Sequence, residues 1–172
     1  EYDQLFGARD ATKRDVHINA FFGVIGERES DPNDDGYREM FYVLRNVMRA
    51  QPGARFDAPA PATNLLDIRV NGTAVPNATY DNVIGWALGG SAPSGVTATA
   101  LRQAILDTWK TRTINLTIPM TLTVGGQSRP IDVHLHTYYG DEGSAYSTAA
   151  RQRYIDAWRT ADVFIYSGHS HL

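Results

Sequence analysis

The sequence predicts an α/β protein with a mostly parallel central sheet, flanked by helices and decorated by inserted antiparallel β-hairpins. Two patterns lead to this class. Residues 131–166 run strand, helix, strand, which is the order of a βαβ unit in a parallel sheet. Residues 114–136 alternate apolar and polar side chains on both sides of a Gly-Gly pair, as an antiparallel hairpin does. We expect one domain over residues 1–172.

The composition narrows the class of function. With 42% hydrophobic and 20% charged residues, the chain resembles an ordinary globular domain. Its net charge of -3 gives no electrostatic reason to expect binding to nucleic acid or to a membrane surface. The absence of cysteine excludes disulfides, thiolate metal sites and a cysteine nucleophile within these residues. Threonine-rich strands without cysteine favour an exported bacterial protein.

The N-terminal part predicts a strand followed by a helix. β-branched and aromatic residues, closed by glycine, indicate a strand from Asp15 to Ile25. An acidic loop over residues 27–36 follows. Residues 37–50 then place apolar side chains at helical spacing, on a face formed by Met40, Phe41, Leu44, Val47 and Met48.

The middle of the chain predicts a hairpin and two helices. Asn71-Gly72 is a strong signal for a two-residue β-turn. Residues 79–95 indicate a short helix and then a loop rich in glycine and serine. Residues 96–111 form a second amphipathic pattern, with an inward face of Leu101, Ile105, Leu106 and Trp109.

The alternating segment predicts the register of a long hairpin. A turn at Gly125-Gly126 pairs Met120 with Ile131, Ile118 with Val133 and Leu116 with Leu135, so that the apolar faces coincide. Asp132, His134 and His136 then share the opposite face. Pro119 and Pro130 indicate that the first arm lies at or near an edge of the sheet.

The C-terminal part predicts a helix and a buried strand. Ser147 or Thr148 caps a helix whose inward face is Tyr154, Ile155, Trp158 and Ala161. Residues 162–167 are apolar on both faces, as in a central strand of a parallel sheet. Ligands bind beyond the carboxyl ends of such strands. The loops at residues 138–143 and 167–171 are expected at that edge.

His169 is the first candidate for chemistry, because it follows this strand. Its neighbours Gly168 and Ser170 let the loop turn sharply and leave the imidazole exposed, as a general base requires. The alternative is a loop histidine that hydrogen-bonds only to backbone.

A metal site is the second candidate. Two histidine pairs, His134 with His136 and His169 with His171, could bind a divalent metal such as zinc, with Asp132, Asp141 or Glu142 completing the shell. The alternative is a set of surface histidines on a half-exposed strand. Three acidic residues after the first strand, Asp31, Asp34 and Asp35, suit either a cation or a solvated loop. His17 has no predictable partner and is interpreted as structural.

The segment "ADVFIYSGHS" resembles the histidine strand of the caspase-like, clan CD cysteine peptidases, including their gingipain-like and clostripain-like branches. In that family a hydrophobic strand ends in a Gly-His loop with the catalytic histidine, and the next strand supplies the cysteine. Residues 131–172 also resemble uncharacterised bacterial caspase-like proteins, and "HINAFFG" suits the first strand of the same sheet. Residues 60–130 have no counterpart and are interpreted as an insertion.

This resemblance implies a hydrolase that cleaves peptides without a cofactor. His169 would be catalytic, with Gly168 and Ser170 shaping its loop, and would deprotonate a cysteine absent from this chain. The chain would then be the histidine-bearing N-terminal part of a larger domain, incomplete at its C-terminal end and inactive alone. We expect the C-terminal remainder of the protein, or a partner chain, to cover the open edge of the sheet.

Two weaker resemblances concern the histidine pairs. "YSGHSHL" resembles the last motif of calcineurin-like metallophosphoesterases, which implies that His136, His169 and His171 associate with metal. The Gly-Asp-x-x-Asp and Gly-Asn-His motifs of that family are absent. "DVHLHT" is similar to the opening motif of the polymerase-and-histidinol-phosphatase family, but the chain ends too soon after it for a barrel. A metal-dependent hydrolase and a non-enzymatic binding or assembly module therefore remain as alternatives.

Overall fold

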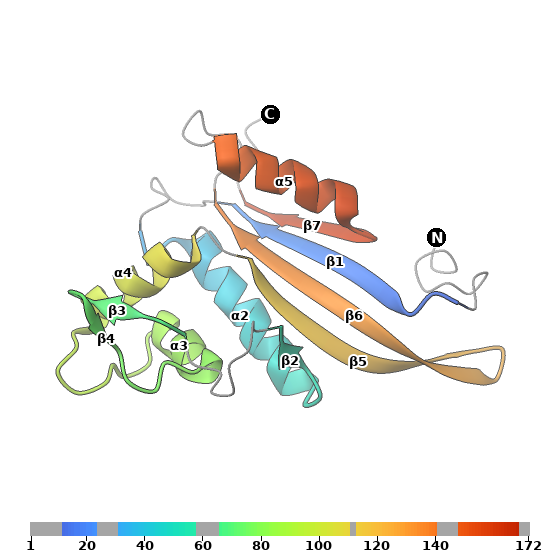
Figure 1. Ribbon diagram of the computed structural model, residues 1–172, viewed down its shortest axis with the longest axis horizontal. Helices are drawn as coiled ribbons and strands as arrows, with labels where there is room; N and C mark the ends of the chain where they lie inside the picture. The colour runs from blue at the N-terminus through green and yellow to red at the C-terminus, as the bar shows by residue number, and fades with distance from the viewer. Residues whose placement is uncertain (1–11, 24–30, 58–65, 111–112, 141–147, 169–172) are drawn as a thin grey trace.

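The computed structural model describes residues 12–23, 31–57, 66–110, 113–140 and 148–168. These residues form a mixed five-stranded sheet, four flanking helices and a separate two-stranded sheet (Figure 1). The α/β class is therefore confirmed. The main sheet has the order β2-β5-β6-β1-β7, where the strands are β1 (Asp15–Phe22), β2 (Arg55–Phe56), β5 (Ile114–Val124), β6 (Gln127–Tyr139) and β7 (Val163–Ser167).

The parallel part of the sheet consists of β6, β1 and β7. β1 lies between the other two strands and is parallel to both. The predicted βαβ unit is present, but β1 separates its two strands. Phe22 stands in register with both Tyr139 and Ser167, so the three strands end at one edge. We call this the carboxyl edge.

The long hairpin has the predicted register. Met120 pairs with Ile131, Ile118 with Val133 and Leu116 with Leu135, around a turn at Gly125-Gly126. The two-residue strand β2 is the only described neighbour on the outer side of β5, as the prolines predicted. The tip of the hairpin extends past the start of β1 (Figure 1). Its apolar face is uncovered there, and Met120 is 45% exposed.

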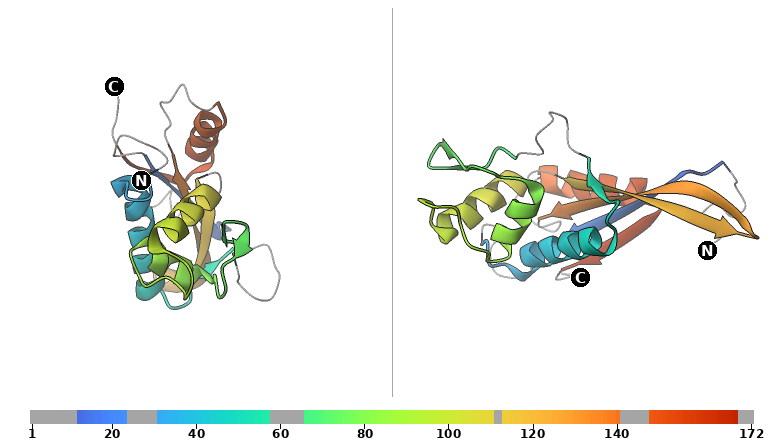
Figure 2. Two further views of the ribbon diagram at one scale, coloured as in Figure 1. Left: turned by 90° about the vertical axis from the view of Figure 1, so that its left-hand side faces the viewer. Right: turned by 90° about the horizontal axis from the view of Figure 1, so that it is seen from below.

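Three helices pack together on one side of the sheet, and α5 (Thr148–Thr160) lies on the other side (Figure 2). The three helices are α2 (Asp35–Ala50), α3 (Tyr80–Ala87) and α4 (Ala98–Trp109). Each begins after a residue whose side-chain oxygen accepts a hydrogen bond from the backbone N–H three positions later; these residues are Asp34, Thr79 and Thr97. Within the described residues, no helix combines the length and apolar character that crossing a bilayer requires.

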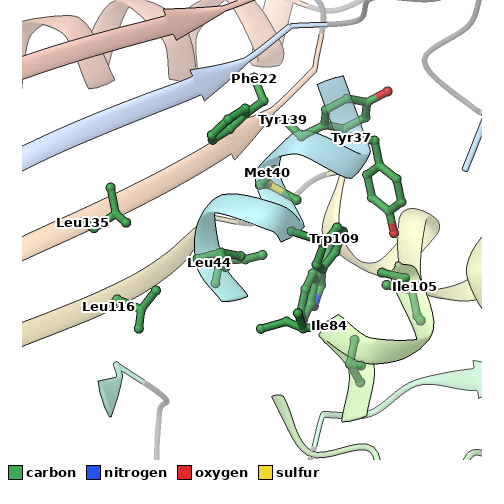
Figure 3. Close-up of a cluster of buried hydrophobic side chains, with 14 of the residues drawn as sticks. Phe22, Tyr37, Met40, Leu44, Ile84, Ile105, Trp109, Leu116, Leu135 and Tyr139 are labelled. Carbon is green, nitrogen blue, oxygen red and sulfur yellow. The ribbon is translucent and has the colours of Figure 1, made fainter. Parts of the chain in front are cut away.

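The core lies between the sheet and these three helices (Figure 3). Trp109 of α4 stacks on Phe41 of α2, with 4.9 Å between ring centroids. Apolar side chains from β5 and β6, among them Leu116 and Leu135, reach the same cluster. Every residue of the predicted face of α4 is buried, and the predicted face of α2 is buried or half-buried.

The predicted hairpin at Asn71-Gly72 is confirmed. β3 (Arg69–Val70) and β4 (Thr73–Ala74) pair across the turn, whose two residues have φ of 51° and 79°. Both values lie in the left-handed region that a two-residue hairpin turn requires. The interpretation of residues 60–130 as an insertion stays a prediction, although this segment contributes β5 to the main sheet.

The predicted inward face of α5 is wrong at Trp158, which is 64% exposed. The face that meets the sheet includes Tyr154, and it also includes Ala157, which is buried. The small side chain of Ala157 lets the helix approach β1, where Asn19 Nδ2 donates to the Ala157 carbonyl at 2.5 Å. This close approach turns Trp158 outward.

The prediction that residues 162–167 form a buried central strand is also wrong for the described part of the chain. β7 is the outer strand of the sheet there, and Ile165 is 48% exposed. On one face Phe164 and Tyr166 pack against Tyr154 of α5. Ile165 points to the other face, which explains why the strand is apolar on both sides and yet not buried on both.

Candidate functional site

The carboxyl edge brings together the ends of β1, β6 and β7. The backbone N–H of Gly23 donates to the Ser167 carbonyl at 2.7 Å, and that of Gly140 donates to the Phe22 carbonyl at 3.1 Å. Ser167 Oγ donates to Glu39 Oε2 at 2.6 Å, which ties the end of β7 to α2. The predicted meeting of the loops after β6 and β7 at one edge is therefore borne out at the strand ends.

Glycines allow the chain segments at this edge to approach closely. A Cβ atom on Gly168 would lie 2.8 Å from Gly23 Cα and 2.7 Å from Tyr166 Oη. A Cβ atom on Gly36, in the first turn of α2, would lie closer still to the Gly23 carbonyl oxygen. The first turn of α2, the end of β1 and the end of β7 therefore pack backbone to backbone.

The predicted catalytic residue and its loop fall mostly outside the described residues. Gly168 lies at the carboxyl edge, directly after β7. His169, Ser170 and His171 lie outside the described residues, and so do Asp141 and Glu142. The structure thus fixes where the chain leaves β7 toward His169.

A second polar cluster lies on the sheet face that also carries α5. We call it the histidine face; it consists of His17, His134 and His136. The three rings are nearly parallel, and the centroid of His17 lies 4.9 Å from that of His134 and 5.5 Å from that of His136. The pairing of β1 with β6 produces this contact, because His17 stands in register with His134.

The contacts of His136 fit its neutral form. Its Nδ1 lies 2.9 Å from Asn115 Oδ1, and its Nε2 lies 3.2 Å from His17 Nδ1. A neutral ring donates to the amide oxygen and accepts from His17. Burial lowers the pKa of His136, and the neighbouring His17 and His134 lower it further, whereas Asp57 raises it.

His134 has a more acidic environment. Its Nε2 lies 3.0 Å from Asp15 Oδ1, and its Nδ1 lies 3.2 Å from Thr117 Oγ1. Thr117 donates its hydroxyl hydrogen to Asp57 at 2.6 Å. The hydroxyl therefore meets His134 as an acceptor, so that His134 Nδ1 is the donor of this contact.

The histidine face is not arranged as a metal centre. Among the described residues, no three acidic or histidine side chains surround a point where a metal ion could sit. His136 also lies three residues before the end of β6, roughly 10 Å along the strand from the carboxyl edge. The structure places it with His17 and His134, and both of its nitrogens have partners there.

His17, for which the sequence offers no partner, contacts both other histidines. Its interpretation as a structural residue stays a prediction. A sequence signal for this contact exists. "DVHINAFF" of β1 and "DVHLHTYY" of β6 share their first three residues and an aromatic pair at the end, and they pair in parallel with this same alignment. Similar strands side by side place like residues together.

The acidic loop has structural roles. Asp34 is buried and caps α2 by accepting from the Tyr37 N–H at 3.1 Å. Asp31 Oδ1 accepts from the backbone N–H and the side-chain amide of Asn33. These contacts give Asp31 a role in the turn and Asp34 a role in capping α2, and Asp34 is buried rather than solvated.

Comparisons with protein-family models, with curated proteins and with solved structures find no match for this chain. The arrangement of its own residues is therefore the basis on which its function is inferred.

Proposed function

We propose that this chain is the histidine-bearing part of a caspase-like cysteine hydrolase that cleaves peptides. His169 would act as general base at the carboxyl edge. The cysteine nucleophile would come from the C-terminal remainder of the protein or from a partner chain, since these 172 residues contain none.

The observation that carries the proposal is the common end of the three parallel strands. β7 delivers the chain to the carboxyl edge at Gly168, next to the ends of β1 and β6. In open α/β sheets, ligands bind outside the carboxyl ends of the strands. His169 directly follows Gly168 in the sequence, which supports a role for it at that edge.

The position of β7 in the sheet also supports the proposal. The resemblance implies that the strand next to the histidine strand supplies the cysteine. On the side of β7 away from β1, no described strand is present, and Ile165 is exposed. A further strand paired there in the parallel direction would bring its own carboxyl end next to that of β7.

The chemistry follows the general pattern of a cysteine and histidine pair. His169 takes the proton from the thiol, and the thiolate attacks the carbonyl carbon of the peptide bond. Backbone N–H groups stabilise the oxyanion that forms. The protonated His169 then gives its proton to the leaving amine, and water hydrolyses the thioester.

The test uses the full-length gene product and fluorogenic peptide substrates. We expect His169→Ala to lower kcat/KM by about 10²- to 10⁴-fold, which is the usual contribution of general acid–base catalysis. Alkylation with iodoacetamide should abolish the same activity. His134→Gln is the matched control, because it removes a histidine that lies on β6 well before the carboxyl edge.

Two results would contradict the proposal. One is peptide hydrolysis that survives both His169→Ala and iodoacetamide. The other is activity lost to a metal chelator and unaffected by alkylation, which would favour the metal-dependent hydrolase instead.

A further inference from the structure

A cavity of about 650 Å³ lies between α2 and α3, next to the C-terminal half of α2 and away from the carboxyl edge. The two helices lie beside each other in Figure 1. The volume is within the range of small-molecule sites. Its lining residues are Arg45, Met48, Arg49, Asp81, Ile84, Gly85, Leu88, Gly89 and Gly90.

The cavity contains two arginines without carboxylate partners. Arg45 and Arg49 are one helical turn apart on α2, and no carboxylate of the described residues lies within 4.0 Å of either guanidinium. Arg45 Nε is buried and has no hydrogen-bond partner in the described part of the chain. Two like charges at this spacing repel each other, so an anion between them would relieve the repulsion.

Arg45 is held in place by its neighbour on α2. Its Cζ lies 4.8 Å from the centroid of the Tyr42 ring. A guanidinium stacked in this way loses little further freedom when a ligand binds. Its planar fork suits the two oxygens of a carboxylate.

Part of the lining is apolar, and a glycine widens it. Met48 and Leu88 are half-buried, whereas Ile84 is only 3% exposed. Gly85 lies inside α3, where alanine would be more stable by about 1 kcal/mol. A Cβ atom on Gly85 would meet nothing within 4 Å, so the missing side chain leaves the cavity wider.

We propose that this cavity binds a small organic carboxylate that carries an apolar chain. The carboxylate lies between Arg45 and Arg49, and the chain contacts Met48 and Leu88. With Asp81 as the one acidic residue in the lining, the two arginines leave a net charge of +1, which suits a singly charged head group.

Calorimetric titration of the whole chain with three probes tests the ligand class. We expect hexanoate to bind at least tenfold more tightly than acetate, because only hexanoate reaches the apolar wall. Hexyl phosphate should bind more weakly than hexanoate, because its second negative charge lies near Asp81. Equal affinities for acetate and hexanoate, or tighter binding of hexyl phosphate, would overturn the assignment, and so would no binding of hexanoate at millimolar concentration.

Variants test the location. Arg49→Gln should weaken hexanoate binding at least tenfold, whereas Arg159→Gln removes an equal charge on α5 and should leave it unchanged. Gly85→Leu should block the cavity and abolish binding while the melting temperature stays equal or rises. Equal effects of Arg49→Gln and Arg159→Gln would show non-specific ion binding and overturn the proposal. Unchanged binding in Gly85→Leu would do the same.

Discussion

Gly23 and Gly168 face each other at the carboxyl edge, and neither position has room for a side chain. The contact involves backbone on both sides, so rotation of a side chain cannot relieve a clash between them. The conformation of the chain as it leaves β7 therefore depends on a residue without a Cβ atom. A single methyl group at position 168 would therefore require the backbone at the carboxyl edge to shift.

Gly168→Ala should destabilise the protein by about 1–3 kcal/mol, the usual cost of overpacking. The added Cβ would lie 2.8 Å from Gly23 Cα, which requires a shift of backbone. Urea unfolding measures the change. Gly85→Ala is the control, since its Cβ meets open space and should raise stability by up to about 1 kcal/mol. A Gly168→Ala variant as stable as the parent would contradict the packing described here.

The contacts of His17 come from residues far away in the sequence. Nothing within a few positions of His17 in the sequence indicates a partner, because its contacts come from His134 and His136 on a strand more than a hundred positions away. Pairing between parallel strands is a long-range property. The "DVH" that the two strands share aligns in the observed register, but the triplet alone does not predict that the strands pair.

At the scale of elements, the histidine face depends on three strands at once. β1 contributes His17, β6 contributes His134 and His136, and β5 contributes the hydrogen-bonding partners Asn115 and Thr117. Protonation of His136 would place a positive charge beside two other imidazoles, and its Nε2 could then no longer accept a hydrogen bond from His17. The pairing of β1 with β6 should therefore weaken in acid.

The free energy of unfolding should fall as the pH drops below about 6.5, where an unperturbed histidine titrates. The pKa of His136 is lower in the folded protein. Between the two pKa values the unfolded chain binds more protons, so stability rises with pH in this window. Urea unfolding at pH 7.5, 6.5 and 5.5 measures the slope.

His136→Gln should reduce this slope, because glutamine does not titrate and can still bond to Asn115. The difference between variant and parent isolates His136 from the other groups that titrate in acid. Parallel stability curves for the two proteins would contradict the assignment of the slope to this residue.

Features that follow from nearby residues in the sequence could be predicted, whereas features that depend on contacts between distant residues could not. The register of β5 and β6 follows from alternation and from the two-residue turn at Gly125-Gly126. The inward face of α5 depends instead on how closely the helix approaches β1, which Ala157 and Asn19 decide. The exposed Trp158 is the consequence.

At the scale of the whole molecule, α2 joins the sheet to α3 and α4 (Figure 3). The order of the strands could not be read from the sequence, since apolar residues on both faces of β7 are equally compatible with a central and an outer position. The α/β class could be predicted, because it requires only the order of elements along the chain. The order of elements also predicts that the candidate site lies where the carboxyl ends of the parallel strands meet.

Two of the three tryptophans, Trp109 and Trp158, should respond very differently to truncation. Trp109 is 2% exposed and stacks on Phe41, so Trp109→Ala should cost about 3–5 kcal/mol. Trp158 is 64% exposed, and Trp158→Ala should change stability by no more than about 0.5 kcal/mol. Chemical denaturation of both variants measures the difference, and similar losses in the two would contradict the packing of α4 or of α5.

The projecting tip of the hairpin has a consequence for how copies of the protein behave in solution. A bare two-stranded ribbon with an apolar face, including Met120 and Val124, is a natural template for aggregation. Pro119 in β5 and Pro130 in β6 lie where neither strand has another described neighbour. Proline has no N–H to donate. On each free side of the ribbon, one backbone donor is therefore missing from the row that a further strand would need for pairing. The same two prolines that indicate an edge in the sequence thus make the ribbon a poorer template for a further strand.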